Sequence, residues 1–157
     1  MNQYGETPLF MAARRGHEKV AKTLLERADV DPNSSNQYGE APLYAAAWEG
    51  HEGVVKMLLN RSDVNPNAAD QHGQTPLFVA IWKGHERIVK TLLERVDVNS
   101  NTANRYGQVP INIAAYWKQE RVVKMLQERA DVRPNTMDND GQRPPSGVAC
   151  QGQKSTH

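Results

Sequence analysis

Apolar residues in this chain fall into two kinds of short segment that alternate. The first kind, as at 42–47, begins with proline and places leucine and alanine on one face at helical spacing. Proline fits the first helical turn because its missing N–H costs nothing there, and Gly50 follows where a helix often ends with positive φ. The second kind, as at 51–60, carries valines and leucines at the same spacing. An Asn-, Pro- and Ala-rich stretch at 63–70 then predicts a loop.

This alternation repeats every 34 residues. Gln3-Tyr4-Gly5 has counterparts at 37–39, 71–73 and 105–107. The chain therefore divides without gaps into units at 2–35, 36–69, 70–103 and 104–137, and the second and third match at 19 of their 34 positions. A degenerate partial unit occupies 138–157, where Pro145 and Gly147 oppose a helix. We expect one array over 1–157, with residues past about 140 frayed.

Each unit is too small to bury its own apolar face, so the units are expected to stack and share a continuous core. Two sets of residues at equivalent positions are assigned to that core: Ala12, Ala46, Ala80 and Ala114, with Leu24, Leu58, Leu92 and Leu126. Thr7 and Thr75 precede the helix-opening proline and can cap the helix. The fourth unit has Val109 there, and Lys118-Gln119 in place of Gly-His, which predicts a poorly capped helix and a strained turn.

Several motifs of the first unit together resemble the ankyrin repeat: Thr7-Pro8-Leu9, Ala12-Ala13, Gly16-His17, the apolar run 20–25 and Asp29-Val30. The resemblance covers nearly the whole chain in register. It implies an all-α fold, an ankyrin-repeat solenoid of stacked helix-turn-helix units with projecting loops. The Pro-Asn at 32–33 and 66–67 is similar to arrays common in filamentous fungi, which often trail an NTPase domain. No such domain occurs within these 157 residues.

The chain departs from the ankyrin pattern in two places. The family's histidine after Thr-Pro-Leu is replaced at 10, 44, 78 and 112, so the usual side-chain hydrogen bonds of that histidine are expected to be absent. The glycine that usually follows the second helix is missing at 26–29, beside the two-residue insertion. The loop tips are therefore not expected to form regular β-hairpins.

Composition narrows the functional classes. The net charge is +1, which makes nucleic acid an unlikely partner. Mean hydropathy is -0.72 and the longest apolar runs are far too short to cross a membrane. No secretion signal opens the sequence, and the single Cys150 excludes an intrachain disulfide framework. We expect an intracellular protein, cytoplasmic or nuclear.

Candidate binding residues lie where stacking does not require them. In ankyrin stacks the loop tips and the exposed side of the first helix form a concave surface. By register, the candidates there are Tyr4, Arg14, Arg15, Tyr38, Trp48, Glu49, His72, Trp82, Lys83, Tyr106, Tyr116 and Trp117. Exposed Trp, Tyr and Arg are common anchors of protein interfaces. Alternatively, the tyrosines pack against the next loop and the tryptophans lean on neighbouring helices.

Other residue patterns favour structural explanations. Lys22, Lys56, Lys90 and Lys124 form a row interpreted as a solvated convex face. His17, His51 and His85 recur with the repeat, so they are too far apart to share a metal ion. Cys150 has no evident histidine partner. No phosphate-binding glycine loop is present, and no acid, base and nucleophile set can be assembled.

The sequence therefore predicts a non-catalytic module, without cofactor or metal, that binds a protein partner on its concave face. Two alternatives stay open. The array could pack in cis against a catalytic or NTPase domain of a longer chain, or its aromatic residues could stack on a small aromatic molecule.

Overall fold

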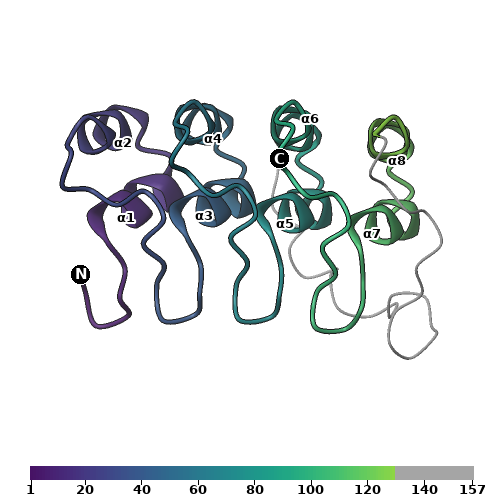
Figure 1. Cartoon of the computed structure of the whole chain (residues 1–157), viewed down its shortest axis with the longest axis horizontal. Helices are drawn as coiled ribbons and strands as arrows, with labels where there is room; N and C mark the ends of the chain where they lie inside the picture. Colours follow the sequence, from purple (N-terminus) through teal and green to yellow (C-terminus); the bar gives the residue numbers. More distant parts are fainter. Residues whose placement is uncertain (130–157) are drawn as a thin grey trace, which may run out of the picture.

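The computed structural model describes residues 1–129 as a row of paired short helices (Figure 1). The helices are α1 (Pro8–Arg15), α2 (Glu18–Leu25), α3 (Pro42–Glu49), α4 (Glu52–Leu59), α5 (Pro76–Lys83), α6 (Glu86–Leu93), α7 (Pro110–Tyr116) and α8 (Glu120–Gln127). No strand occurs within the described range. The all-α repeat solenoid expected from the sequence is confirmed, whereas the expectation of fraying past about 140 falls outside the described residues.

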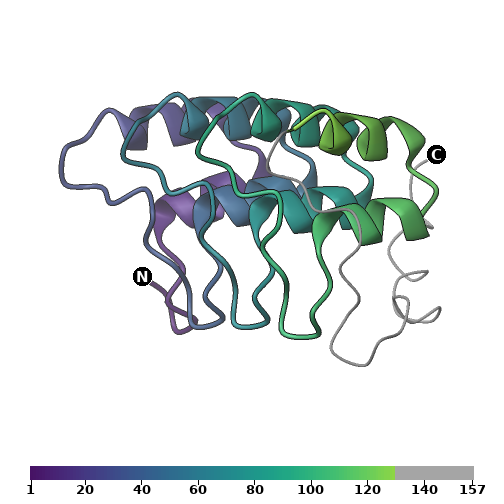
Figure 2. The same ribbon diagram turned by 45° about the vertical axis from the view of Figure 1, so that its right-hand side comes forward.

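The helices form two layers. The odd-numbered helices make one row and the even-numbered helices make the other, and each helix packs against its counterpart in the next unit (Figures 1 and 2). Turns at 2–6, 36–40, 70–74 and 104–108, here called the fingers, project from the odd-numbered row, away from the even-numbered row. Longer connections at 26–35, 60–69 and 94–103, the back loops, link each even-numbered helix to the next finger.

The helix ends follow the sequence signals. The Thr7 and Thr75 hydroxyls accept hydrogen bonds from the N–H groups of the residues three positions on, at 3.1 and 3.2 Å. Val109 provides no side-chain cap for α7. The turn after α7 places Lys118 at φ 55, whereas glycine holds the corresponding left-handed position after α1, α3 and α5. The predicted weak cap and strained turn of the fourth unit are therefore confirmed.

The core runs along the interface between the two helix layers. The alanines at 12, 46, 80 and 114 are buried, which lets the odd-numbered helices approach closely. Leu58, Leu92 and Leu126 are fully buried, whereas the equivalent Leu24 is only half-buried, because within residues 1–129 no preceding unit packs against α2. The lysines at 22, 56, 90 and 124 are exposed, as expected for a convex face.

The back loops show how these helices end without the missing glycine. The last carbonyls of a helix lack partners within the helix, and here an arginine of the next unit supplies the donor. The contact recurs at three interfaces: Arg61 to the Leu25 carbonyl, Arg95 to Leu59 (3.0 Å) and Arg129 to Leu93 (2.9 Å). A cation is also favourable at a helix C-terminus. The helices α2, α4 and α6 are thus each capped by the next unit.

Asparagines of the insertion join successive back loops. The Asn33 amide donates to the Asp63 carbonyl at 2.7 Å and accepts from the Asn65 N–H at 2.7 Å. Asn67 makes the same two contacts with Asp97 and Asn99, at 2.7 and 2.8 Å. The insertion therefore forms an ordered ladder between units.

Candidate partner-binding surface

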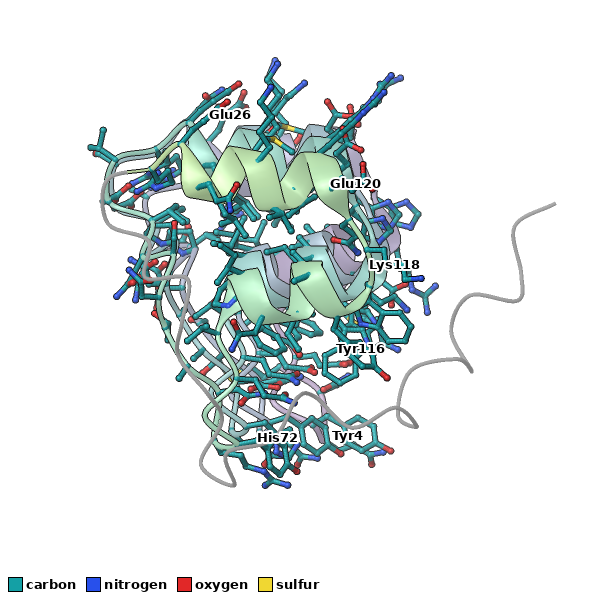
Figure 3. All side chains as sticks on the ribbon, turned by 90° about the vertical axis from the view of Figure 1, so that its right-hand side faces the viewer. Tyr4, Glu26, His72, Tyr116, Lys118 and Glu120 are labelled. Carbon is teal, nitrogen blue, oxygen red and sulfur yellow. The ribbon has the colours of Figure 1, made fainter. Side chains whose placement is uncertain are left out.

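The fingers and the odd-numbered helices meet at an angle and form the two walls of the candidate surface. Viewed along the stack, Tyr4 and His72 lie on the fingers and Tyr116 lies beside the odd-numbered row (Figure 3). Equivalent residues of successive units are aligned along this view, so each of the two walls carries a row of side chains.

Each finger is built around one side chain at its first residue. In the first two fingers, the Oδ1 atoms of Asn2 and Asn36 accept backbone N–H bonds from two and four residues on, at 2.9 to 3.0 Å. Asp70 and Asn104 repeat this arrangement. A glycine with positive φ, such as Gly39 at φ 80, completes the turn. The sequence shows these residues recurring, but their turn-forming role was not assigned from it.

Neighbouring fingers are joined by a single backbone hydrogen bond. The Gln37 N–H donates to the Tyr4 carbonyl at 3.0 Å, and equivalent bonds join Gln71 to Tyr38 and Arg105 to His72 at 2.9 Å. The fingers thus form a continuous wall without regular β-hairpins. The side chains of Tyr4, Tyr38 and Tyr106 are exposed on it, and His72 is half-buried. The wall fixes the backbone at each tip while leaving the tyrosine rings accessible.

The helical wall carries the aromatic row. Trp48 and Trp82 are half-buried and pack against the core, and Tyr116 is half-buried as well. Trp48 stacks on Tyr44 with ring centroids 6.2 Å apart and planes 13° apart. The ring centroids of Trp82 and Phe78 are 5.9 Å apart. Each tryptophan therefore rests on the aromatic residue one helical turn earlier and still presents part of its ring.

Some of the charged candidates contact another side chain, and others are exposed without such a contact. Arg14 pairs with the buried Glu6 at 2.7 Å, so it ties α1 to the first finger. Lys83 Nζ lies 4.8 Å from the centroid of the Trp48 ring, a cation–π distance. Arg15 and Glu49 are exposed. The surface thus offers both signs of charge beside aromatic rings.

Trp117 sits differently from its counterparts Arg15, Glu49 and Lys83. It is the C-terminal cap of α7, with φ -84 and ψ 8, and its ring meets Tyr116 edge-on at 5.1 Å and 88°. The shorter helix α7 and the Lys118 turn put the two aromatic rings against each other. The fourth unit therefore presents a Tyr–Trp pair where the second and third units present one ring beside a charge.

Tyr44 was not among the candidates, yet it anchors the centre of the surface. Its hydroxyl donates to Asp70 Oδ2 of the next finger at 3.1 Å. Burial, followed by the nearby Asp70 carboxylate, raises the pKa of Tyr44 far above its usual value, so the hydroxyl stays protonated as a donor. At the position of the family's histidine, Tyr44 therefore makes a side-chain hydrogen bond of its own, to the neighbouring unit.

His51 and His85 have a structural role in the turns that join the two helices of their units. His51 Nε2 donates to the Arg14 carbonyl and His85 Nε2 to the Trp48 carbonyl, both at 3.1 Å. In the fourth unit, Gln119 Nε2 donates to the Ile81 carbonyl at 2.7 Å. The Gly-His pair thus links one unit's helix end to the next unit, and Gln119 replaces that link.

Within residues 1–129, no three His, Cys, Asp or Glu side chains come together as a metal site. An open hollow near the start of α6 is lined by Glu52, Glu86, Arg87 and Arg121, which form ion pairs across it at 3.5 and 3.8 Å. No helix in this range is long and apolar enough to span a membrane. Cys150 lies outside the described residues.

Comparison with known protein families agrees with this architecture. The family described as "Ankyrin repeats (3 copies)" matches at residues 1–70, 30–102 and 62–138. The three overlapping matches together span most of the chain. A comparison with curated proteins found no match.

Proposed function

Because this chain belongs to the ankyrin repeat family, we propose that it is a non-catalytic module that binds a protein partner on its concave face. Ankyrin repeats are generally protein–protein interaction modules and are typically non-catalytic. Fold alone does not assign a function, so the proposal rests on the side chains of the two walls.

The observation that carries the proposal is the aromatic row along the stack. Trp48, Trp82 and Tyr116 each keep part of a ring accessible, and they face a wall of fingers with exposed Tyr4, Tyr38 and Tyr106. Large rigid rings lose little conformational entropy on binding, and they dominate the energetics of protein interfaces. The fold needs only the buried parts of these rings, so their accessible parts are available to a partner.

Charge adds selectivity to this surface. Arg15 and Glu49 are exposed on consecutive units, and Lys83 covers Trp48. A partner segment with apolar side chains flanked by charges of both signs would complement these groups. With the chain's net charge of +1, a nucleic acid is a poor match.

A small aromatic ligand is less well supported than a protein. The Trp48 ring already contacts Tyr44 and Lys83, so a stacking ligand would have to displace one of them. Packing in cis against another domain of a longer chain would be favoured if the array retained no protein specifically in the test below. We further propose an intracellular site of action, which the single cysteine supports.

The test is affinity capture followed by titration. Extract from cells that express the protein is passed over the wild-type array, a Trp82→Ala variant and a Lys90→Ala control on the convex face. A protein retained by wild type and control is then titrated against all three. Trp82→Ala is expected to weaken binding by about 2 kcal/mol, with unchanged circular dichroism. Equal affinity of the wild type and Trp82→Ala would remove Trp82 from the site.

A further inference from the structure

A row of charges of alternating sign lies beside the aromatic row on the helical wall. Arg15, Glu49 and Lys83 are the last residues of α1, α3 and α5 and stand 34 positions apart. Arg15 and Glu49 are exposed and Lys83 is half-buried. None of the three forms an ion pair within residues 1–129. Their charges are therefore not neutralised by an oppositely charged side chain of the described array.

The packing of the odd-numbered helices sets the spacing along this row. These helices lie side by side (Figure 1), and packed helices are roughly 8–10 Å apart. A polyproline II segment completes a turn in three residues and advances about 9.3 Å in doing so. Every third side chain of such a segment therefore lies on the same side, one turn for each repeat. A β-strand differs, because residues three apart point to opposite faces.

Both walls carry aromatic rings at the same interval. Trp48 and Trp82 are half-buried on the helical wall, and Tyr4 and Tyr38 are exposed on the fingers. Tyr4 and Tyr116 lie on the same side of the molecule, away from the back loops (Figure 3). Aromatic-lined grooves are the surfaces that bind proline-rich segments, whose preformed polyproline II conformation limits the entropy lost on binding. The two walls therefore combine the rings and the spacing that such a segment requires.

We propose that the two walls bind a proline-rich segment in the polyproline II conformation, with acidic, basic and acidic side chains at every third residue and prolines between them. This inference rests on the proposed function and specifies the chemistry of the partner. The three charged side chains would pair with Arg15, Glu49 and Lys83 in turn, and the prolines would lie against the accessible parts of the rings. The charge order is the same in both directions, so either direction of the segment satisfies it.

The test titrates synthetic peptides into the intact chain by isothermal titration calorimetry. The probe is Glu-Pro-Pro-Arg-Pro-Pro-Glu with both ends blocked. The control, Pro-Pro-Glu-Arg-Glu-Pro-Pro, has the same composition but places the three charges on adjacent residues. The probe is expected to bind about fivefold tighter than the control, because only its charges match the repeat spacing. Equal affinities, or no binding of the probe, would overturn the inference.

A charge exchange at Glu49 tests the register. Glu49→Lys is expected to weaken binding of the probe about fivefold and to favour Glu-Pro-Pro-Glu-Pro-Pro-Glu by a similar factor, because the central charge pair changes from attraction to repulsion and back. Glu94→Lys is the matched control, since Glu94 is exposed on the even-numbered row and the net charge changes equally. If the two variants shift both affinities alike, the central residue does not contact Glu49 and the inference fails.

Two further outcomes separate this inference from its alternatives. An α-helix advances about 10.5 Å in seven residues, so an alanine-based helical peptide with Glu, Arg and Glu seven residues apart presents the same charges. Tighter binding of that helix than of the proline-rich probe would overturn the inference. A captured protein whose affinity falls with Trp82→Ala but not with Glu49→Lys would also overturn it, while leaving the proposed function intact.

Discussion

The interface between the second and third repeats and the interface between the third and fourth meet the same requirement with different chemistry. At the former, His85 donates to the Trp48 carbonyl, and its ring lies directly beneath Gly50. At the latter, Gln119 donates to the Ile81 carbonyl and leaves space around Gly84, where an added Cβ would meet nothing closer than 3.9 Å. Both side chains cap the end of the preceding helix.

The difference shows what the repeat keeps and what it relaxes. A side-chain hydrogen bond to a carbonyl near the end of the preceding first helix persists, although the acceptor shifts by one position, from Trp48 to Ile81, which precedes the equivalent Trp82. The close contact between ring and glycine is lost. The fourth repeat has also lost its threonine cap, at Val109, and its turn glycine, at Lys118. Because stability in a solenoid adds along the row, repeat four should be the weaker end of the described array.

The substitutions Gly50→Ala and Gly84→Ala should destabilise the protein to different extents and so distinguish the two interfaces. Gly50 and Gly84 both have positive φ, at 89° and 76°, which costs alanine about 1 kcal/mol. At Gly50 the new Cβ would also lie 2.8 Å from the His85 ring and disturb its hydrogen bond, for a total of about 2 kcal/mol. Urea unfolding should rank Gly50→Ala as clearly more destabilising than Gly84→Ala. Equal losses would mean that the ring contact contributes nothing.

Removing the threonine cap of α5 should lower the stability of the protein, and adding a threonine cap to α7 should raise it. Thr75→Val removes the hydroxyl that accepts from the Phe78 N–H at 3.2 Å and should cost about 1 kcal/mol. Val109→Thr should add an equivalent cap and stabilise by about 0.5 kcal/mol. Thermal unfolding of the two variants and the wild type measures both changes in stability. A destabilised Val109→Thr would indicate that burial of the Val109 side chain outweighs the cap.

Relieving the strained turn at Lys118 should change the stability of the protein by less than removal of the α5 cap. Lys118 has φ 55, which a residue with a Cβ adopts at a cost and glycine adopts freely. Lys118→Gly should stabilise by about 0.5 kcal/mol, because the greater unfolded-state entropy of glycine offsets part of the relief. Lys124→Gly, an exposed position inside α8, serves as the control and should destabilise by about 1 kcal/mol. Loss of stability in Lys118→Gly would contradict a strained turn.

The smallest expected effect is a difference in pH dependence. Burial lowers the pKa of His85 below its usual value, with a lesser lowering by Lys83, although the Trp48 carbonyl acts in the opposite direction. The unfolded chain therefore takes up this proton at higher pH than the folded chain does. His85 thus costs stability as the pH falls through about 6.5 toward its lower folded-state pKa.

His85→Gln places at this position the non-ionisable side chain that Gln119 provides in the fourth unit. The variant should lose less stability than wild type between about pH 7.5 and pH 5, as measured by urea midpoints across that range. His17→Gln is the matched control, because His17 is exposed. Parallel pH profiles for wild type and His85→Gln would show that burial of this ring has no consequence for stability.

Much of the fold could be predicted because its signals are local. Proline before each first helix, glycine after it and apolar residues at helical spacing all act within a few residues, and the structure places the helices there. The weakened cap and turn of repeat four were also predictable, since Val109 and Lys118 break rules that depend only on their own position.

The candidate surface could be predicted only as a set of aligned positions. Register places Trp48 and Trp82 in one row, and both lie in that row, half-buried. It could not show that Lys83 covers Trp48, that Arg14 is paired with Glu6, or that Tyr44 bonds to Asp70. The last two pairs join residues 8 and 26 positions apart, and only folding brings them together.

By itself, therefore, the sequence determined the period, the helices and their local ends, because each depends on the conformational preferences of neighbouring residues. The tertiary structure decided how one unit caps the next: Arg61 and Arg95 on helix carbonyls, His85 on Trp48, and Asn33 and Asn67 between back loops. The recurrence of these residues was visible in the sequence. Their partners are backbone groups about one repeat away, and backbone carbonyls leave no signature in the amino-acid order.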